Sequence, residues 1–264
     1  MRLWQKLLMA SAKPFVPPES GYLGHVELGT FLHNGSELPR PTRPWRDDQN
    51  HVCGEDGSSG NGNIPALSGT MANYSFGDTS SNPANRLKWH KYVEDDKTIY
   101  VCDRNILRSV SHEHLNAGGY VGSGKTYNID GKNYKCRLLY CGDRFRSGTN
   151  DGLWYGGTNL PNEWHRYIMN GCDVTEGPFF EGSPIPESVD WDTTSSQYSN
   201  PDSMARPHNQ AWWWNAMYSW GQETWYFDTT QRVLRGCFSV RFVAHNSASS
   251  VSTPHGFRPA LVEE

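Results

Sequence analysis

The stretch RLKWHKYVEDDKTIYVCDRNI, residues 86–106, carries the clearest fold signal in the chain. Residues 87–93 and 98–102 are rich in aromatic and β-branched side chains, a composition typical of strands. The acidic run Glu94-Asp95-Asp96 separates them and favours a tight turn. The segment therefore predicts two strands joined as a hairpin.

Short helices and further strands are expected downstream. Ser111 can cap a short helix over 112–117, which Gly118 and Gly119 would end. The next segment, 125–142, predicts a second hairpin that turns at Asp130-Gly131. A second short helix is expected in PNEWHRYIMNG, residues 161–171.

The rest of the C-terminal half is rich in loops and closes with strands. Residues 172–210 are rich in Gly, Pro, Ser, Asp and aromatic residues, and strand-like segments follow at 211–227, 232–245 and 255–264. No fixed repeat appears. This layout predicts an α+β fold of short strands with two short helices and a long loop-rich C-terminal half.

The N-terminal residues differ in composition from the rest of the chain. Prolines in KPFVPPE (13–19) and ELPRPTRPW (37–45) disfavour helices and regular ladders. Between them, GYLGHVELGTFLH (21–33) can form one or two strands that pack on their own domain or on a partner, and a flexible leader is the alternative. We expect residues 1–60 to form an extended attachment arm and residues 61–264 to form a binding domain.

Composition and charge narrow the possible partners. The 264 residues include 11 Trp, 13 Tyr and 10 Phe, and the net charge is only −4 without a basic block. We therefore do not expect a nucleic-acid backbone as a partner. We expect recognition through the contact area of aromatic side chains instead. No apolar run reaches the roughly 18 residues needed for membrane insertion, and the opening LLMA is too short for an ordinary signal peptide.

Six cysteines occur, with no CxxC pair and no zinc-ligand spacing. We interpret them mostly as free thiols, and one or two disulfides remain the alternative.

The segment GYVGSGKT, residues 119–126, matches the phosphate-loop pattern. A working phosphate loop lies between a buried strand and a helix, because the helix N-terminus holds the phosphates. Here a polar helix is expected before the segment and a strand after it. We therefore interpret it as a glycine-rich link with Lys125 in solvent, and expect no nucleotide cofactor.

Other catalytic signals are weak. His112 and His114 flank Glu113, but no third metal ligand is apparent, so a solvated helix face is the preferred interpretation. Ser219 does not lie in a GxSxG elbow. We expect a protein that is not an enzyme and has neither cofactor nor metal.

Four segments in order carry a family resemblance: NEWHRYI (162–168), SWGQE (219–223), VLRGCFSV (233–240) and GFRPALV (256–262). This set resembles C-type-lectin-fold ligand-binding proteins of phages and bacteria. These include hypervariable proteins diversified by diversity-generating retroelements, and phage tail- or head-fibre adhesins. The resemblance covers residues 85–264 and implies a C-type lectin-like fold.

The resemblance implies that the shared motifs are framework. Trp220 would fill the core, Arg235 and Arg258 would pair with buried carbonyls or carboxylates, and Gly236 and Gly256 would permit close backbone approach. The ligand would contact residues between these motifs, where aromatics mix with Asn, Ser and His as in antibody paratopes. The candidate ligand-binding residues are Trp225, Tyr226, Phe227, Asp228, Thr230, Gln231, Phe238, Arg241, Phe242, His245, Asn246, Ser249, Val251 and His255. Because side chains alternate along strands, about half of them would instead face the core.

The chain lacks the functional motifs of two other groups of proteins in this fold class. Formylglycine-generating enzymes use a pair of cysteines near the C-terminus, and this chain has only Cys237 there. The EPN and QPD tripeptides of calcium-dependent lectins are missing as well, so calcium-free glycan binding remains open.

The expected function is that of a phage virion receptor-binding protein, assembled in the host cytoplasm and acting outside the cell. A loop-rich face would bind a host-surface glycan or protein, and the N-terminal arm would contact other virion proteins. A homo-oligomer is expected, since adhesins gain strength from repetition. A structural decoration or baseplate protein is the alternative.

Overall fold

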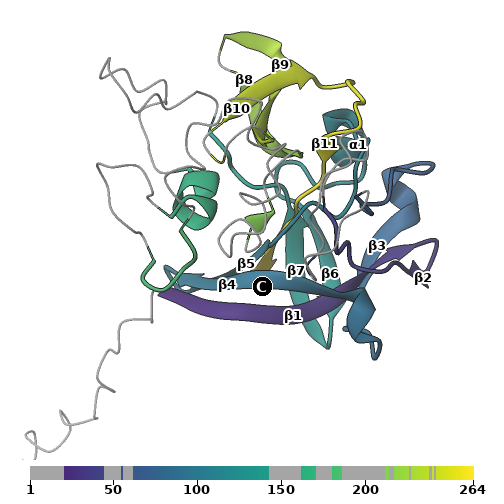
Figure 1. Ribbon diagram of the computed structural model, residues 1–264, viewed down its shortest axis with the longest axis vertical. Helices are drawn as coiled ribbons and strands as arrows, with labels where there is room; N and C mark the ends of the chain where they lie inside the picture. Colours follow the sequence, from purple (N-terminus) through teal and green to yellow (C-terminus); the bar gives the residue numbers. More distant parts are fainter. Residues whose placement is uncertain are drawn as a thin grey trace, which may run out of the picture.

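The computed structural model shows a strand-rich molecule with a large curved sheet and a smaller sheet beside it (Figure 1). It describes residues 21–44, 55, 62–142, 162–170, 180–185, 212–213, 217–225, 227–237, 240 and 242–264. In those ranges no helix is both long and apolar enough to pass through a bilayer.

The large sheet has eight strands in the order β2-β1-β4-β5-β12-β7-β6, and β3 pairs with β1 outside this path. Every pairing in it is antiparallel. Its strands are β1 (Gly21–His33), β2 (Ser36–Glu37), β3 (Tyr74–Gly77), β4 (Arg86–Glu94), β5 (Lys97–Cys102), β6 (Lys125–Ile129), β7 (Lys132–Arg137) and β12 (Ala260–Glu263).

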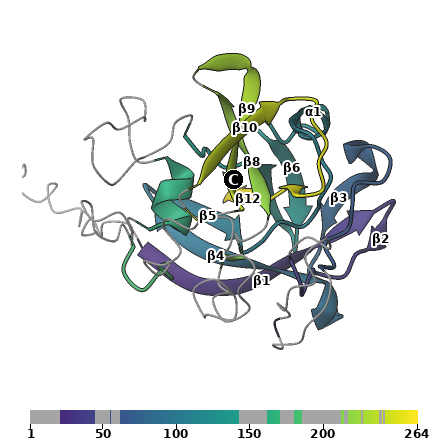
Figure 2. The ribbon, with the colours of Figure 1, turned by 45° about the horizontal axis from the view of Figure 1, so that its top comes forward.

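The small sheet has four strands in the order β10-β9-β8-β11. They are β8 (Tyr218–Trp225), β9 (Asp228–Gly236), β10 (Val243–Ser247) and β11 (His255–Gly256). Strand β11 pairs with β8 in parallel, and the other pairs are antiparallel. Figures 1 and 2 show the β8–β9 hairpin projecting from the molecule on the side away from β1.

Helical structure in the described residues is limited to short pieces. These are η3 (Met71–Asn73), η4 (Pro83–Asn85), the α-helix α1 (His112–Ala117) and the π-helix η5 (Trp164–Ile168). Strands make up 47% and helices 11% of the described residues, so the fold is β-rich, and the expected α+β class, with its C-type lectin-like fold, is wrong. The short helices were expected, but the class was misjudged because their one or two turns add little to two sheets that dominate the core.

Local sequence signals are confirmed where turns and caps decide the structure. Asp95 (φ 47°) and Asp96 (φ 63°) make the turn between β4 and β5, and Asp130 (φ 51°) and Gly131 make the turn between β6 and β7. Asp and Gly tolerate this left-handed backbone. The Ser111 side chain accepts a hydrogen bond from the His114 amide and caps α1 as expected.

The second expected helix is present but is a π-helix. The Oδ1 atom of Asn162 accepts a hydrogen bond from the His165 amide at 2.9 Å, so Asn162 lies near its start as predicted. Gly171, the expected stop, lies outside the described residues.

The N-terminal segment is part of the large sheet. Strand β1 pairs with β4 and β3 and contributes Leu28 and Phe31 to the core, so the strand expected over 21–33 is confirmed. An arm that ended at residue 60 would separate β1 from the sheet to which it belongs. Residues 1–20 lie outside the described part of the chain.

The framework residues lie in the core where the small sheet meets the large one. The Trp220 indole is 1% exposed and donates to the Val110 carbonyl at 2.7 Å. Arg258 is fully buried and donates to the carbonyls of Cys102 and Asp103 beside β5, which confirms that it pairs with buried carbonyls. A Cβ atom on Gly256 would approach the Asn105 side chain to 2.6 Å, so glycine there permits close backbone approach.

The phosphate-loop match is a link between α1 and β6. Lys125 is the first residue of β6, so a strand rather than a helix follows the glycines, as expected. Its ammonium lies 5.2 Å from the centre of the Tyr127 ring. The backbone here offers no helix N-terminus to a phosphate.

The four described cysteines, Cys102, Cys136, Cys141 and Cys237, are buried and carry thiols rather than disulfides. Burial raises the pKa of Cys102 to about 12 and raises the pKa of Cys136 and of Cys141. Buried apolar thiols of this kind are unreactive. Cys53 and Cys172 lie outside the described residues.

Candidate binding surface

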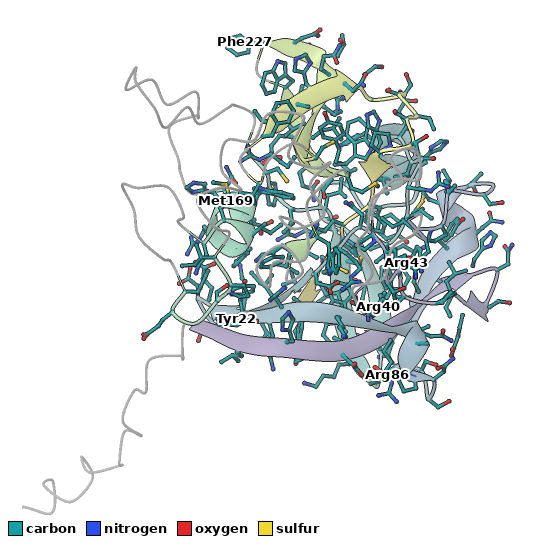
Figure 3. All side chains as sticks on the ribbon, in the orientation of Figure 1. Tyr22, Arg40, Arg43, Arg86, Met169 and Phe227 are labelled. Carbon is teal, nitrogen blue, oxygen red and sulfur yellow. The ribbon has the colours of Figure 1, made fainter. Side chains whose placement is uncertain are left out.

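An aromatic side chain stands exposed where β8 meets β9. Trp225 pairs with Asp228 at the end of this hairpin, and Phe227 lies in the connection between them. Phe227 is 64% exposed, more than any other large apolar side chain in the described ranges. Figure 3 places it at the extremity of the small sheet.

Two further rings support Phe227. The Trp225 and Phe227 ring centres are 5.8 Å apart, and Trp225 stacks on His245 of β10 at 4.6 Å with an angle of 21° between the planes. Trp225 also packs against the second hydrophobic cluster of the core. We call Trp225, Phe227 and His245 the aromatic tip.

Polar residues fix the backbone beside the aromatic tip. The Asp228 carboxylate accepts hydrogen bonds from the hydroxyl of Thr230 at 2.7 Å and from its amide at 2.9 Å. These bonds lower the pKa of Asp228, so the carboxylate is ionised at neutral pH. Arg232 donates to the carbonyls of Thr229 and Gln231. These local hydrogen bonds hold the start of β9 next to the aromatic tip.

The structure gathers most of the described candidate residues on this outer part of the small sheet. Asp228, Thr230 and His245 are exposed, and Gln231 and Asn246 are half-buried. Ser249 and Val251 are exposed in the connection from β10 to β11. Tyr226, Phe238 and Arg241 lie outside the described residues.

Two candidates do not point freely to solvent. Phe242 is half-buried and packs against Tyr218 at a ring-centre distance of 6.3 Å. His255 is 4% exposed in β11, with its ring edge-on to Trp220 at 5.0 Å. A ligand cannot reach His255 without opening the core, so it belongs to the framework. Because β11 is only two residues long, no alternation could reveal which way this side chain faces.

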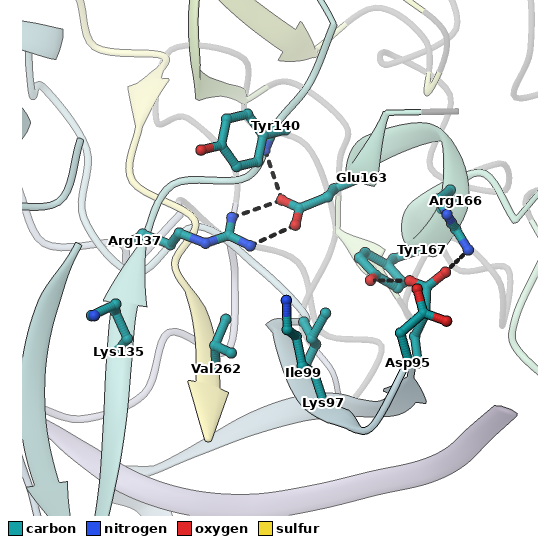
Figure 4. A pocket seen from close by; sticks show the side chains of 11 residues that line it. Asp95, Lys97, Ile99, Lys135, Arg137, Tyr140, Glu163, Arg166, Tyr167 and Val262 are labelled. Atoms are coloured by element: carbon teal, nitrogen blue, oxygen red, sulfur yellow. Dashed lines mark hydrogen bonds and ion pairs between the residues drawn. The ribbon is translucent and has the colours of Figure 1, made fainter. Parts of the chain in front are cut away.

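Sequence reasoning missed a polar groove on the large sheet beside η5, which is lined by residues of β5, β7, β12 and η5 (Figure 4). One signal was present in the sequence of β7. Lys135 and Arg137 alternate with the core residues Tyr134 and Cys136, so both basic side chains lie on the face of the strand away from that core. Other lining residues come from the segment 163–167, and no local sequence pattern links this segment to β7.

No group of three or more His, Cys, Asp or Glu side chains suited to a metal ion occurs within the described ranges. His112 is buried under Trp220 rather than on a solvated helix face, because α1 packs against the core through His112 and Leu115.

No protein-family model, curated protein sequence or solved structure matches this chain. The functional assignment therefore depends on the geometry of its surface and on the motifs quoted above.

Proposed function

We propose that this chain is a non-enzymatic receptor-binding protein of a phage virion, and that its aromatic tip contacts a molecule on the host surface. The observation that carries the proposal is the exposure of Phe227 beside the stacked pair Trp225 and His245. Exposed aromatic side chains give a large contact area at little conformational cost.

The motifs support the viral assignment. SWGQE, VLRGCFSV and GFRPALV resemble segments of phage ligand-binding proteins and fibre adhesins. Trp225 and Phe227 of the tip lie between the first two segments, and His245 lies between the last two. Weak contacts at one tip would be strengthened by several copies on one particle. Under this proposal the chain is a homo-oligomer whose other surfaces contact virion proteins.

The test is binding of the labelled full chain to a panel of bacterial strains, measured by flow cytometry. We expect binding to a subset of strains and a loss of about tenfold or more in the double variant Trp225→Ala/Phe227→Ala, as for a central aromatic contact. Leu23→Ala is the matched control, because Leu23 is also an exposed apolar residue (46%) but lies on β1.

Equal binding by the tip variant and the wild type would contradict the proposal. The alternative is a structural virion protein whose aromatic tip is buried against neighbouring subunits. A cryo-EM map of the assembled particle distinguishes the two, because the tip faces solvent in one case and a subunit contact in the other.

A further inference from the structure

The polar groove beside η5 has an apolar floor and a defined size. Ile99 of β5 and Val262 of β12 are cross-strand neighbours and form part of this floor. The groove has a volume of about 460 Å³, within the range of sites that bind small molecules. It shares no residue with the aromatic tip, so it is a separate candidate site.

Ion pairs fix one wall of the groove. The guanidinium of Arg137 donates to both carboxylate oxygens of Glu163, at 2.7 and 2.5 Å, and the Tyr140 amide donates to the same carboxylate at 2.8 Å. Burial disfavours the charged form of Arg137, but the bonds to Glu163 outweigh it and raise the pKa of Arg137. These charges neutralise each other, and the pair gives the groove a rigid edge.

A second pair fixes the opposite wall. Glu94 accepts a hydrogen bond from the Tyr167 hydroxyl at 2.7 Å and is ion-paired with Arg166 of η5 (Figure 4). Glu94 and Glu163 are therefore both occupied by protein partners. A ligand would meet few available carboxylates in the groove, of which Asp95 in the β4–β5 turn is one.

Two lysines leave positive charge available to a ligand. Lys97 precedes Ile99 by two residues on β5, so the two side chains share a face, and Lys97 has no ion-pair partner among the described residues. Lys135 is the cross-strand neighbour of Val262 and pairs with Glu264 at 3.0 Å, where both side chains are more than a third exposed. Such an exposed ion pair is weak, so a ligand carboxylate can replace Glu264 as the partner of Lys135.

An exposed aromatic ring completes the groove. Tyr140 lines it, is 46% exposed, and carries the Arg137 guanidinium over its ring at 5.0 Å. An aromatic ring in contact with water offers an apolar surface to the C–H face of a sugar ring. Sugar hydroxyls can donate to Asp95 and accept from lysine ammonium groups.

We propose that this groove binds an acidic saccharide. The sugar carboxylate lies at the ammonium groups of Lys97 and Lys135, and the sugar ring lies against Tyr140. A neutral sugar would leave the lysine charges unused. A carboxylate without a ring would lose the contact with Tyr140.

The experiment is an NMR titration of the full chain with methyl β-D-glucuronide, methyl β-D-glucoside and acetate as separate probes. We expect the glucuronide to bind more tightly than the other two. Lys97→Gln/Lys135→Gln is expected to weaken glucuronide binding about tenfold, and Tyr140→Ala to weaken binding of both sugars. All three substitutions are at surface side chains, and the spectrum of each variant shows directly whether it folds.

Lys125→Gln is the control, because it removes one exposed lysine charge outside the groove and should leave glucuronide binding unchanged. Equal affinity for glucuronide and glucoside, or glucuronide binding that survives loss of both lysines, would overturn the proposal. Acetate binding as tight as the glucuronide would assign the groove to simple carboxylates instead. Absence of binding by all three probes would also overturn it, while leaving the role of the aromatic tip to the cell-binding test.

Discussion

The indole of Trp225 stacks on the imidazole of His245, with ring centres 4.6 Å apart, and thereby joins β8 and β10, the two strands that flank β9. Trp225 is half-buried by this stack and by the core, whereas Phe227, two residues further on, is 64% exposed. The two aromatic residues therefore have different roles.

Phe227→Ala should change the free energy of unfolding by less than about 0.5 kcal/mol, because the ring is mostly in water already. Trp225→Ala should lower it by about 2 kcal/mol, since stacking and core contacts are lost. Urea denaturation of both variants measures the difference. Equal losses would mean that Phe227 is also a structural residue and would weaken its assignment to ligand contact.

Acid should destabilise the protein through His112. Burial, and then the positive charge of Arg232, lower the pKa of this histidine from 6.5 to about 4. The unfolded chain then binds the proton more readily than the folded chain. The free energy of unfolding has its full value above about pH 6.5 and falls as the pH drops towards about 4. His112 accounts for roughly 2 kcal/mol of this loss.

Denaturation midpoints recorded from pH 7.5 to pH 4 provide the measurement. In the variant His112→Gln the denaturation midpoint should depend less steeply on pH. Some pH dependence should remain, because burial also lowers the pKa of His255. An unchanged slope in the variant would show that His112 does not contribute.

Arg258→Met should destabilise the protein by about 4 kcal/mol. Its guanidinium is fully buried, and its loss leaves several buried acceptors without a donor. These acceptors are the Ser219 hydroxyl and the carbonyls of Cys102, Asp103, Trp212 and Trp213.

Arg86→Met is the matched control for Arg258. Arg86 is 30% exposed, pairs with Glu27 at 3.1 Å and donates to the carbonyls of Ser80 and Ser81, groups that water can reach when the side chain is removed, so its replacement should cost about 1 kcal/mol. Guanidinium denaturation measures both losses. Similar losses would show that the buried hydrogen bonds of Arg258 have little net effect.

Gly124→Ala should destabilise the protein by about 2–3 kcal/mol, while Lys125→Ala should have almost no effect. Gly124 has φ +80°, and a Cβ atom there would lie 2.6 Å from the Cys136 carbonyl oxygen. Thermal unfolding with and without MgATP is the measurement. A rise in melting temperature with MgATP that disappears in Lys125→Ala would restore the phosphate-loop interpretation.

Sequence reasoning succeeded where neighbouring residues decide the structure. The Asp130-Gly131 turn and the Ser111 cap depend on contacts within four residues, and both are confirmed. Trp220 and Arg258 were placed in the core by a resemblance rather than by local physics. The balance of sheet against helix was misjudged because it depends on which strands pair.

The candidate site shows the same division. The sequence named Phe227 as a candidate contact residue at the end of a strand-like segment, but the hairpin connection that exposes it comes from the pairing of β8 with β9. The inward orientation of His255 follows from pairing with Tyr218, about forty residues earlier, and was not readable. The groove needs β5, β7, β12 and η5 together, so only the folded chain could reveal it.

Strand β12 lies between β5 and β7, and the Tyr100 hydroxyl donates to Glu263, 163 residues further along the chain. During folding, until β12 pairs with them, β5 and β7 each have an open edge with unpaired backbone N–H and C=O groups. Closing so long a loop is slow, and open edges invite pairing with other chains. Refolding at high protein concentration should therefore compete with aggregation, and a synthetic peptide spanning 256–264 should compete for the gap and slow productive folding.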